Sequence, residues 1–470
     1  MTNSNQILVM KFGGTSVGSI AALRQVTAIV QAARHDWPNL IVVTSAFNGI
    51  TNQLLASAAA AARGNLQPYE QALQDIEQRH YQALAAFGAS PTAEAQHEIN
   101  RLVQQFSQLI LAIAAIGESS PRALDAVASL GEKMSVAVLT AALQSTSLPA
   151  ITVDASQLIH TDDRFQNAGP DIEATSRQSR QVLLPLLEKG QIPVAAGFIG
   201  AAPCGAVTTL GRGGSDYSAA LLAAVLPADE VWIWTDVDGV MTTDPRVVPE
   251  ARTIPAISYQ EVAELAYYGA KVLHPKSIRP VIEAGITLRV LNTFNPKSPG
   301  TLLTGEQQNL NGTTIKAVTA FRGVQLITIE GRGMLGVPGV AARIFSAVAT
   351  TGATVPLITE ASSEQSICFA VPAEMTARVL EVLEQELAGE ITNRNIDRVW
   401  ASEEVVIITV VCPAMRRKLG IAGRVFSALG DAEVNVLAIA HGSSEVSINL
   451  VVAVEDCQRT VTALHALTTS

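Results

Sequence analysis

Residues 207–218 read Val-Thr-Thr-Leu-Gly-Arg-Gly-Gly-Ser-Asp-Tyr-Ser, and residues 234–240 read Trp-Thr-Asp-Val-Asp-Gly-Val. A third segment of the same kind, Lys11-Phe-Gly-Gly-Thr-Ser16, lies near the N-terminus. Each segment ends an apolar run with small residues, one or two charges and a hydroxyl, which suits a backbone cradle for phosphate or carboxylate groups. Three such loops, each after a strand-like run, predict a binding site at one edge of an α/β sheet.

The composition limits the class of protein. A chain of 470 residues is too long for one ordinary core, so we expect two or three domains. Hydrophobic residues make up 48% and charged residues 16%, which predicts large buried cores rather than disorder. The net charge is −10 and there is no long basic run, so we expect neither nucleic acid nor an anionic membrane as a partner.

Cysteine and histidine usage indicates the compartment and the metal chemistry. Cys204, Cys368, Cys412 and Cys457 lie far apart and form no CxxC, which favours a reducing, cytoplasmic setting. We find no apolar run of membrane-spanning length, and Ile7–Met10 is too short for the core of a signal peptide. The seven histidines form no HxH or HExxH pair, so a dedicated zinc site is not expected.

Hydrophobic periodicity gives the order of the secondary structure. Short apolar runs predict strands at 7–10, 40–43, 150–153, 193–196 and 230–234. Helical patterns cover 20–34 after a capping Ser19, most of 51–147, 215–226 and 258–268. Strands that alternate with helices predict a largely parallel sheet that is covered on both faces. The stretch Asn295–Gly312 is rich in turn formers, so we expect a first domain over 1–295.

An internal repeat follows this boundary. Gly339-Val-Ala-Ala-Arg-Ile-Phe-Ser-Ala347 matches Gly420-Ile-Ala-Gly-Arg-Val-Phe-Ser-Ala428, and the same offset of 81 pairs Ser362-Ser-Glu364 with Ser443-Ser-Glu445. Each copy reads as strand, loop, helix, strand, strand, helix. This order predicts two ferredoxin-like βαββαβ modules, over 314–395 and 396–470.

The N-terminal segment has two interpretations. Gly13 and Gly14 let the backbone approach an anion closely, and Lys11 adds a mobile positive charge. The pattern is neither a Walker loop nor a dinucleotide fingerprint. The alternative is an ordinary strand-to-helix turn with a surface lysine.

The segment Gly211-Arg-Gly-Gly-Ser-Asp216 is more specific. Three glycines bracket Arg212, whose guanidinium fork can hold a carboxylate through two hydrogen bonds. Asp216 stands where the following helix begins, so its alternative role is a helix N-cap.

Two carboxylates follow the predicted strand at 230–234. Asp236 and Asp238 at the carboxyl end of a strand suit Mg²⁺ or a nucleotide, while the alternative for Asp238-Gly239 is a simple turn. Asp244-Pro-Arg246 is also turn-like and places an arginine near the same edge.

Three further residues have plain alternatives. Glu132 lies in the predicted helix 122–144, where a solvated helix face is the simple interpretation. Thr51 is either a loop hydroxyl or a helix cap. His274, before Pro275, is expected to pack or to cap a helix rather than act as a base.

Taken in chain order, six motifs resemble the aspartate kinase family: KFGGTS, TSAFNGITN, GEKMS, TLGRGGSDYSA, WTDVDGVMTTDPR and YYGAKVLHP. The repeat resembles the paired ACT regulatory domains of that family. The likeness extends from Lys11 to about Val454 and is greatest to the kinase part of bifunctional aspartokinase–homoserine dehydrogenases.

The resemblance implies an amino acid kinase fold that uses ATP and Mg²⁺ to phosphorylate the β-carboxylate of L-aspartate. This would be the first step of lysine, threonine and methionine biosynthesis. A carboxylate acceptor is already ionised at neutral pH, so no general base is needed, and catalysis reduces to positioning and electrostatics.

The resemblance also assigns roles by motif. Phosphate contacts would be Lys11, Gly13, Gly14 and Ser16. Aspartate contacts would be Thr51, Glu132, Arg212, Gly213, Gly214 and Ser215, with Glu132 facing the ammonium and Arg212 a carboxylate. Further nucleotide contacts would be Thr235, Asp236, Met241, Arg246, Lys271 and Val272; Met241 departs from the usual Tyr. Lys11 and Asp216 would be catalytic, and Asp216 would position Mg²⁺ or organise the lysines.

Regulation and assembly follow from the ACT pair. The resemblance implies a homodimer or a dimer of dimers with feedback inhibition by threonine or, second, lysine. Glu360 and His441 stand where threonine-regulated relatives tend to carry Gln. Two alternatives stay open: another amino acid kinase that acts on glutamate, acetylglutamate or UMP, and a non-catalytic amino-acid sensor.

Overall fold

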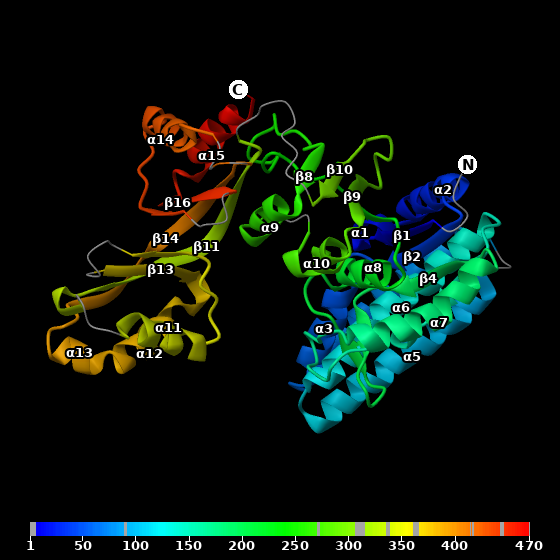
Figure 1. Cartoon of the computed structure of the whole chain (residues 1–470). Helices are drawn as coiled ribbons and strands as arrows, with labels where there is room; N and C mark the ends of the chain where they lie inside the picture. The colour runs from blue at the N-terminus through cyan, green and yellow to red at the C-terminus, as the bar shows by residue number, and fades with distance from the viewer. Residues whose placement is uncertain are drawn as a thin grey trace. The chain divides into compact units, whose positions relative to one another are not determined.

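A computed structural model describes residues 6–88, 92–269, 273–305, 315–334, 339–360, 366–413, 415, 418–441 and 446–469 (Figure 1). The chain divides into two compact units. The first contains Met1–Val240, Pro255–Tyr259 and Leu273–Glu306; the second contains Met241–Ile254, Gln260–Val272 and Gln307–Ser470. These units therefore differ from a simple division at residue 295, because two segments before that residue belong to the second unit.

The first unit is built on a sheet whose strand order is β3-β4-β2-β1-β7-β9-β10-β8 in the described part of the chain. Its strands are β1 (Ile7–Phe12), β2 (Asn39–Thr44), β3 (Ala150–Val153), β4 (Ile192–Ala196), β7 (Glu230–Thr235), β8 (Ala256–Ser258), β9 (Thr287–Asn292) and β10 (Thr301–Thr304). All neighbouring pairs are parallel except β9 with β10. The predicted parallel sheet is confirmed, as is each of the five predicted strands.

Strand β1 lies at the centre of this sheet. Every residue of β1 is buried, so both faces of the sheet are covered, since successive side chains of a strand point to opposite faces. Phe12 is in register with Thr44 of β2 and with Trp234 of β7. The loops that follow these three strands therefore leave the sheet at the same edge.

Helices surround the sheet of the first unit (Figure 1). They are α1 (Gly14–Val17), α2 (Ile20–Asp36), α3 (Ile50–Ala61), α4 (Gln67–Ala85), α5 (Thr92–Ile116), α6 (Pro121–Ser145), α7 (Ile172–Glu188), α8 (Gly214–Val225) and α10 (Pro275–Glu283). The hydroxyl of Ser19 accepts a hydrogen bond from Ala22 N (3.2 Å), which confirms the predicted cap of α2. A hairpin of β5 (Ile199–Ala201) and β6 (Val207–Thr209) leads into α8.

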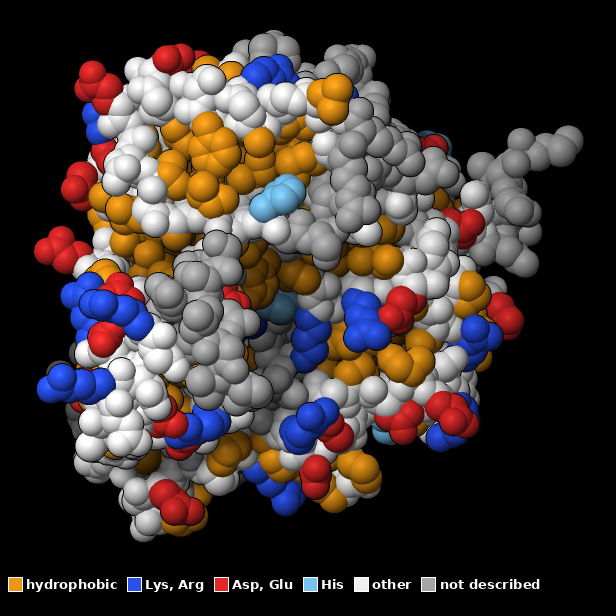
Figure 2. All heavy atoms as spheres, turned by 60° about the vertical axis from the view of Figure 1, so that its left-hand side comes forward, with side chains coloured by type: hydrophobic (Ala, Val, Ile, Leu, Met, Phe, Trp, Pro, Cys, Tyr) orange, Lys and Arg blue, Asp and Glu red, His pale blue; other side chains and the backbone are white. Residues whose placement is uncertain are grey.

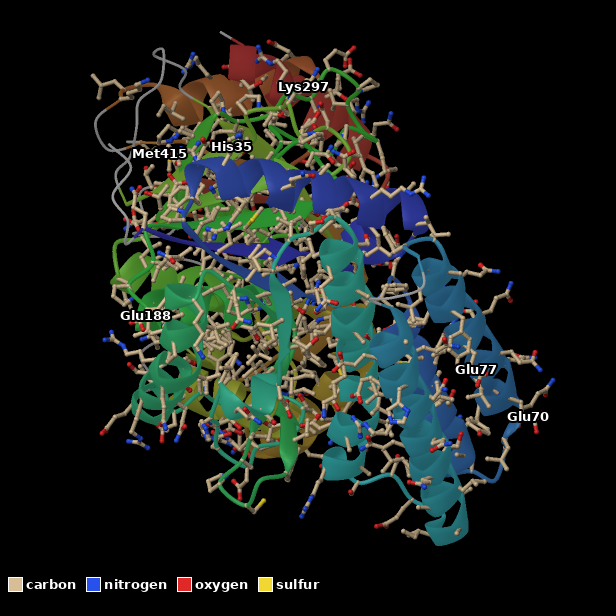
Figure 3. The ribbon with its side chains drawn as sticks, turned by 90° about the vertical axis from the view of Figure 1, so that its right-hand side faces the viewer. His35, Glu70, Glu77, Glu188, Lys297 and Met415 are labelled. Carbon is tan, nitrogen blue, oxygen red and sulfur yellow. The ribbon has the colours of Figure 1, made fainter. Side chains whose placement is uncertain are left out.

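Helix α4 shows how the helical layer is held. Ala72, Ile76 and His80 on one face are buried in the unit, as an amphipathic pattern requires. Glu70 and Glu77 point away from the helical layer (Figure 3).

Two helices correct the expectation that no apolar run is long enough to cross a membrane. By length and composition, Ala93–Ile116 within α5 and all of α6 meet that criterion. Within the protein, 89% of the apolar window of α6 and 33% of that of α5 is buried. Helix α6 is thus a core helix of the unit, and the sequence criterion failed because scattered polar residues interrupt its apolar pattern.

The second unit contains an antiparallel sheet with the strand order β12-β13-β11-β14-β16-β15 among the described residues. The strands are β11 (Ala317–Glu330), β12 (Ile358–Glu360), β13 (Ser366–Pro372), β14 (Arg398–Val411), β15 (Ala438–Ala440) and β16 (Ser447–Ala453). The helices are α9 (Tyr259–Tyr267), α11 (Val340–Thr350), α12 (Thr376–Glu386), α13 (Ala388–Thr392), α14 (Ile421–Asp431) and α15 (Cys457–Ala466). The repeated segments 362–364 and 443–445 lie outside the described residues.

The two repeats share their long strands β11 and β14. Residues 324–330 of β11 belong with the first repeat, where Ile327 and Ile329 pack in its core. Ile315 and Val318, by contrast, pack with Ile408 in the core of the second repeat. The register shifts between Phe321 and residue 324, where β11 passes from one core to the other. The core of the second module therefore includes the first part of β11, which precedes the first module's own strands in the sequence. The two modules are thus interlocked and do not simply follow one another.

Helix α9 is anchored to the sheet of the second unit by polar contacts. Glu261 is fully buried and forms an ion pair with Lys316 Nζ (2.8 Å). Ser447 Oγ donates to Glu264 Oε2 (2.7 Å), and the hydroxyl of Tyr268 donates to Pro356 O (3.1 Å). Because charges removed from water need a partner, the Glu261–Lys316 pair fixes this helix in one place.

We predict that Lys316→Met destabilises the protein by about 3–5 kcal/mol, because it leaves the buried Glu261 carboxylate without its cation. The double variant Lys316→Met/Glu261→Met should recover most of this loss. The measurement is the denaturant midpoint of unfolding. Arg398→Met, which breaks the exposed pair with Glu330, is the matched control and should cost about 1 kcal/mol or less. Equal effects of the two single variants would contradict the prediction.

Candidate active site

The Lys11 loop is fixed where β1, β2 and β7 end. Gly13 N donates to Trp234 O (3.1 Å) at the end of β7. A Cβ at Gly14 would lie 2.8 Å from Ala46 O, so only glycine fits against the loop that follows β2. Asn48 N donates to Gly14 O (3.1 Å) and joins the two loops. The backbone of this loop is therefore held rigidly at the edge of the sheet.

The side chain of Ser16 is buried and helps to hold the Lys11 loop at the edge of the sheet. Its buried hydroxyl donates to Trp234 O (3.4 Å) and accepts from Thr293 Oγ1 (2.7 Å). The hydroxyl therefore ties three segments together, and its predicted phosphate contact stays a prediction.

An ion pair joins β1 to α8. Lys11 Nζ lies 2.5 Å from Asp216 Oδ1, and the two side chains are only 10% and 15% exposed. Lys11 is thus no ordinary surface lysine. The N-cap of α8 is Gly213 at φ +72°, so the interpretation of Asp216 as an N-cap is wrong; Asp216 lies in the first turn and faces Lys11.

A cavity of about 530 Å³ opens beside this ion pair, between the loops after β1 and β2, the start of α8 and helix α6. It brings together nine of the predicted residues: Lys11, Gly14, Thr51, Glu132, Arg212, Gly213, Gly214, Ser215 and Asp216. Gly13, Ser16, Thr235 and Asp236 do not line it. The segments that carry these nine residues are separated along the chain, so the folded sheet edge creates the site.

Glu132 is the most unusual group in this cavity. It lies in α6 and is only 4% exposed, so the interpretation as a solvated helix face is wrong. Thr51 Oγ1 donates to Glu132 Oε1 (3.4 Å), while the buried Oε2 has no hydrogen-bond partner among the described residues. Burial raises the pKa of Glu132 to about 7. A buried carboxylate with one free oxygen is suited to receive a cation such as an ammonium group.

Asp125 is a cavity residue that the sequence reasoning missed. It lies two turns before Glu132 on α6 and is almost fully buried. Its Oδ2 accepts from Gln166 N and Thr209 N (both 2.9 Å), and its Oδ1 accepts from Thr209 Oγ1 (2.8 Å). Burial raises the pKa of Asp125, and these hydrogen bonds oppose the rise. The available signal was an aspartate seven residues before a glutamate within an apolar helix.

The Arg212 loop forms the opposite wall of the cavity. Gly211 and Gly213, on either side of Arg212, have φ of +76° and +72°, a backbone conformation that favours glycine. The Arg212 side chain is exposed and makes no ion pair with any described residue. Its guanidinium is therefore available to a carboxylate in the cavity.

His274 caps α10, as predicted. Its Nδ1 accepts from Lys276 N (3.2 Å). Burial lowers the pKa of His274, and the charges of Arg212 and Lys276 lower it further. The lowered pKa favours the neutral ring, whose Nδ1 can accept the capping hydrogen bond.

The second pair of carboxylates, Asp236 and Asp238, already has partners within the protein. Thr235 Oγ1 donates to Asp236 Oδ1 (3.2 Å). Asp238 Oδ1 accepts from the side-chain amides of Asn292 (2.8 Å) and Asn295 (3.0 Å), so Asp238 ties its turn to the end of β9 and the residues that follow. No cluster of three or more His, Cys, Asp or Glu that could hold a metal occurs among the described residues. A Mg²⁺ ion at Asp216 would therefore need oxygen ligands from bound phosphates.

Two of the remaining predicted nucleotide contacts, Met241 and Arg246, belong to the second unit. Met241 forms a bridge with Thr253, and Arg246 pairs with Asp244 (2.6 Å). Lys271 and Val272 lie outside the described residues.

Comparison with known proteins shows the following similarities. Residues 6–292 match the profile of the amino acid kinase family, and residues 327–387 and 408–467 each match the ACT domain. The chain is 34% identical to the bifunctional aspartokinase/homoserine dehydrogenase of Haemophilus influenzae, over 97% of this chain and 56% of that protein. It thus spans about half the length of the bifunctional relatives. It is also 34% identical to lysine-sensitive aspartokinase 3 of Escherichia coli, over 98% of this chain and 99% of that protein.

Two solved structures have the same fold over nearly the whole chain. Escherichia coli aspartokinase III in complex with aspartate and ADP superposes with a TM-score of 0.83 at 33% identity, covering 99% of this chain and 100% of that one. The same enzyme in complex with lysine and aspartate gives 0.77 at 34% identity, with the same coverage.

The raised pKa of Glu132 predicts a pH-dependent stability. The folded-state pKa of about 7 exceeds the ordinary value of 4.5, so the folded state favours the protonated form. The contribution of protonated Glu132 to the free energy of unfolding is therefore fully present below the unfolded pKa and is lost as pH rises through about 7. The unsubstituted protein should therefore lose stability as pH rises, whereas Glu132→Gln, which has no charge at this position, should not. The difference in the free energy of unfolding between the two should grow in favour of Glu132→Gln from about pH 5 to about pH 8, by up to about 3 kcal/mol.

The measurement is the unfolding midpoint at both pH values without substrate. Glu118→Gln, at an exposed position after α5, is the control and should show no such difference. If Glu132→Gln is no more stabilising at the higher pH than at the lower, then burial of the ionised Glu132 carboxylate does not destabilise the folded protein.

Proposed function

Because the chain belongs to the amino acid kinase family and, within it, to the aspartokinases, we propose that it is an aspartate kinase. It transfers the γ-phosphoryl group of ATP to the β-carboxylate of L-aspartate and forms 4-phospho-L-aspartate. The observation that carries this proposal is one cavity in which a buried Lys11–Asp216 ion pair, an unpaired Glu132 oxygen and the Arg212 guanidinium converge.

The charges around the cavity match those of L-aspartate. In its ionised form Glu132 binds the substrate ammonium through the oxygen that has no protein partner, and Thr51 orients this carboxylate. Arg212 binds a substrate carboxylate through its fork, with Gly213, Gly214 and Ser215 beside it. The solved complexes of Escherichia coli aspartokinase III with aspartate support this substrate.

Phosphoryl transfer brings two anions together, so charge must be neutralised. The substrate β-carboxylate is ionised at neutral pH, and no group is needed to remove a proton. Lys11 supplies positive charge next to the backbone of Gly13 and Gly14, and Asp216 holds its ammonium at the cavity. Bound Mg²⁺ would screen the phosphates, with Asp216 as the residue that positions it.

ATP is the proposed donor, which the ADP in the aspartokinase III structure supports. The proposed nucleotide contacts, beyond Lys11, are Gly13, Gly14, Ser16, Thr235, Asp236, Met241, Arg246, Lys271 and Val272.

We also propose that an amino acid, threonine or lysine, regulates the enzyme at its ACT modules. The complex of Escherichia coli aspartokinase III with lysine supports an effector of this class. Glu360 and His441 are exposed on the second unit, where an ionised glutamate accepts hydrogen bonds but donates none. Assays with threonine, lysine, both and neither test this proposal, which fails if no amino acid changes the rate.

A homodimer or a dimer of dimers is the proposed assembly. The edge strands β12 and β15 carry the exposed residues Ile358 and Ile439. Figure 2 shows hydrophobic side chains gathered on the face that it presents. Exposed apolar surface on edge strands favours association. We propose a cytoplasmic location, since none of the four cysteines forms a disulfide.

A single assay separates the proposed function from its alternatives. ADP release is measured with L-aspartate, L-glutamate, N-acetyl-L-glutamate and UMP, each with and without Mg²⁺. We expect ADP release only with L-aspartate and Mg²⁺. A preference for another acceptor would identify a different amino acid kinase, and no release with any acceptor would favour a non-catalytic sensor.

We predict that Lys11→Met lowers turnover by about 10³-fold, because it removes a preorganised charge from the site of transfer. Circular dichroism and thermal unfolding establish that the variant is folded. Lys189→Met, at an exposed lysine after α7, is the matched control and should turn over normally. Unchanged turnover by folded Lys11→Met would show that Lys11 has no part in catalysis.

We predict that Glu132→Gln and Arg212→Lys each raise the KM for aspartate by about 10-fold or more, with a much smaller effect on the KM for ATP. The first variant loses the charge that faces the ammonium, and the second keeps the charge but loses the bidentate fork. Steady-state kinetics with each substrate varied in turn measures both constants. A rise in the KM for ATP alone would show that the assignment of Arg212 to the amino acid is wrong.

A further inference from the structure

We propose that Ser277 and Lys276, in the first turn of α10, are positioning residues that hold Arg212 in place for the substrate carboxylate. The inference rests on the proposed aspartate kinase function. Neither side chain lines the cavity, so each would act on the substrate indirectly, and the contacts below lead to the loop that carries Arg212.

Ser277 holds the residue that follows Arg212. Its buried hydroxyl donates to Gly213 O (2.9 Å). A Cβ at Gly213 would lie 2.5 Å from Ser277 Oγ and 2.9 Å from His274 Cβ. The loop and the first turn of α10 are therefore in direct contact, and only glycine leaves room for the hydrogen bond.

Lys276 holds the residues that precede Arg212. Its Nζ donates to Leu210 O (3.3 Å) and to Asn167 Oδ1 (2.8 Å). A Cβ at Gly211 would lie 2.9 Å from the same Asn167 oxygen, so this part of the loop is also closely packed. Lys276 Nζ lies 5.4 Å from the centre of the Tyr217 ring in α8, which adds a cation–π contact.

These contacts matter because a glycine-rich loop is costly in entropy to hold in one conformation. Two glycines in left-handed conformations flank Arg212, and glycine loses more conformational freedom on ordering than any other residue. A two-point hydrogen bond to a carboxylate requires the guanidinium to lie in one orientation. Holding the carbonyls of Leu210 and Gly213 means that less entropy is lost when aspartate binds.

The test compares variants of α10 in the full-length chain. We expect Ser277→Ala and Lys276→Met each to raise the KM for aspartate by about 5- to 10-fold, with the KM for ATP changed by less than about 2-fold. Ser277→Thr keeps the hydroxyl and should restore most of the aspartate affinity. Arg279→Gln, which breaks the exposed pair with Glu283 on the same helix, is the matched control and should have no effect.

A double-mutant cycle with Arg212→Ala separates positioning from general structural damage. If Ser277 acts through Arg212, Ser277→Ala should cause no further rise in the KM for aspartate once Arg212 is alanine. Thermal unfolding shows whether each variant is folded. If Ser277→Ala proves to be destabilised, Lys276→Met tests the same inference from the other side of the Arg212 loop.

Three results would overturn the inference. One is an equal effect of Ser277→Ala with and without Arg212, and another is an equal rise in the KM for ATP. The third is no phosphorylation of aspartate by the unsubstituted enzyme, which would overturn the proposed function as well. The first two results, with normal aspartate turnover of the unsubstituted enzyme, would leave the proposed function standing.

Discussion

Lys11 and Asp216 lie far apart in the sequence, yet their side chains form an ion pair that is largely shielded from water. The pair requires β1 to lie between β2 and β7 in register, because only then does Lys11 reach the sheet edge at which α8 begins. It also requires glycine at position 214, where a Cβ would lie 2.6 Å from the Phe198 ring. The central sheet, the glycine loops and the cavity thus depend on one geometric condition, the shared edge at which these strands end.

The cavity keeps a carboxylate in an environment that disfavours its charge. Asp125 and Glu132 occupy the same helix, but three hydrogen bonds of 2.8–2.9 Å satisfy both oxygens of Asp125, whereas the Oε2 of Glu132 has no hydrogen-bond partner among the described residues. Asp125 therefore stabilises the wall of the cavity. We expect the buried Glu132 to lower the stability of the protein at neutral pH while leaving one oxygen available to a cationic group, as is common where activity and stability conflict.

The glycine-rich loop and the regulatory modules both depend on contacts from short segments of chain. The first turn of α10 holds the Arg212 loop through Lys276 and Ser277. Within the second unit, α9 is anchored by the buried Glu261–Lys316 pair. Only a few residues separate the end of α9 from the start of α10 in the sequence. The anchored helix α9 and the first turn of α10, which holds the Arg212 loop, are therefore close neighbours along the chain.

The sequence by itself determined the features that depend on local patterns. Apolar runs predicted the strands β1, β2, β3, β4 and β7, Ser19 predicted a helix cap, and the 81-residue offset predicted the pair of repeated modules. Glycines beside charges marked the loops that line the cavity. Only the tertiary structure decided that Glu132 is buried, that Asp216 faces Lys11 rather than capping its helix, and that β11 serves two cores. Burial and choice of partner are set by residues distant in the sequence, and a local pattern carries no information about which distant segments will meet.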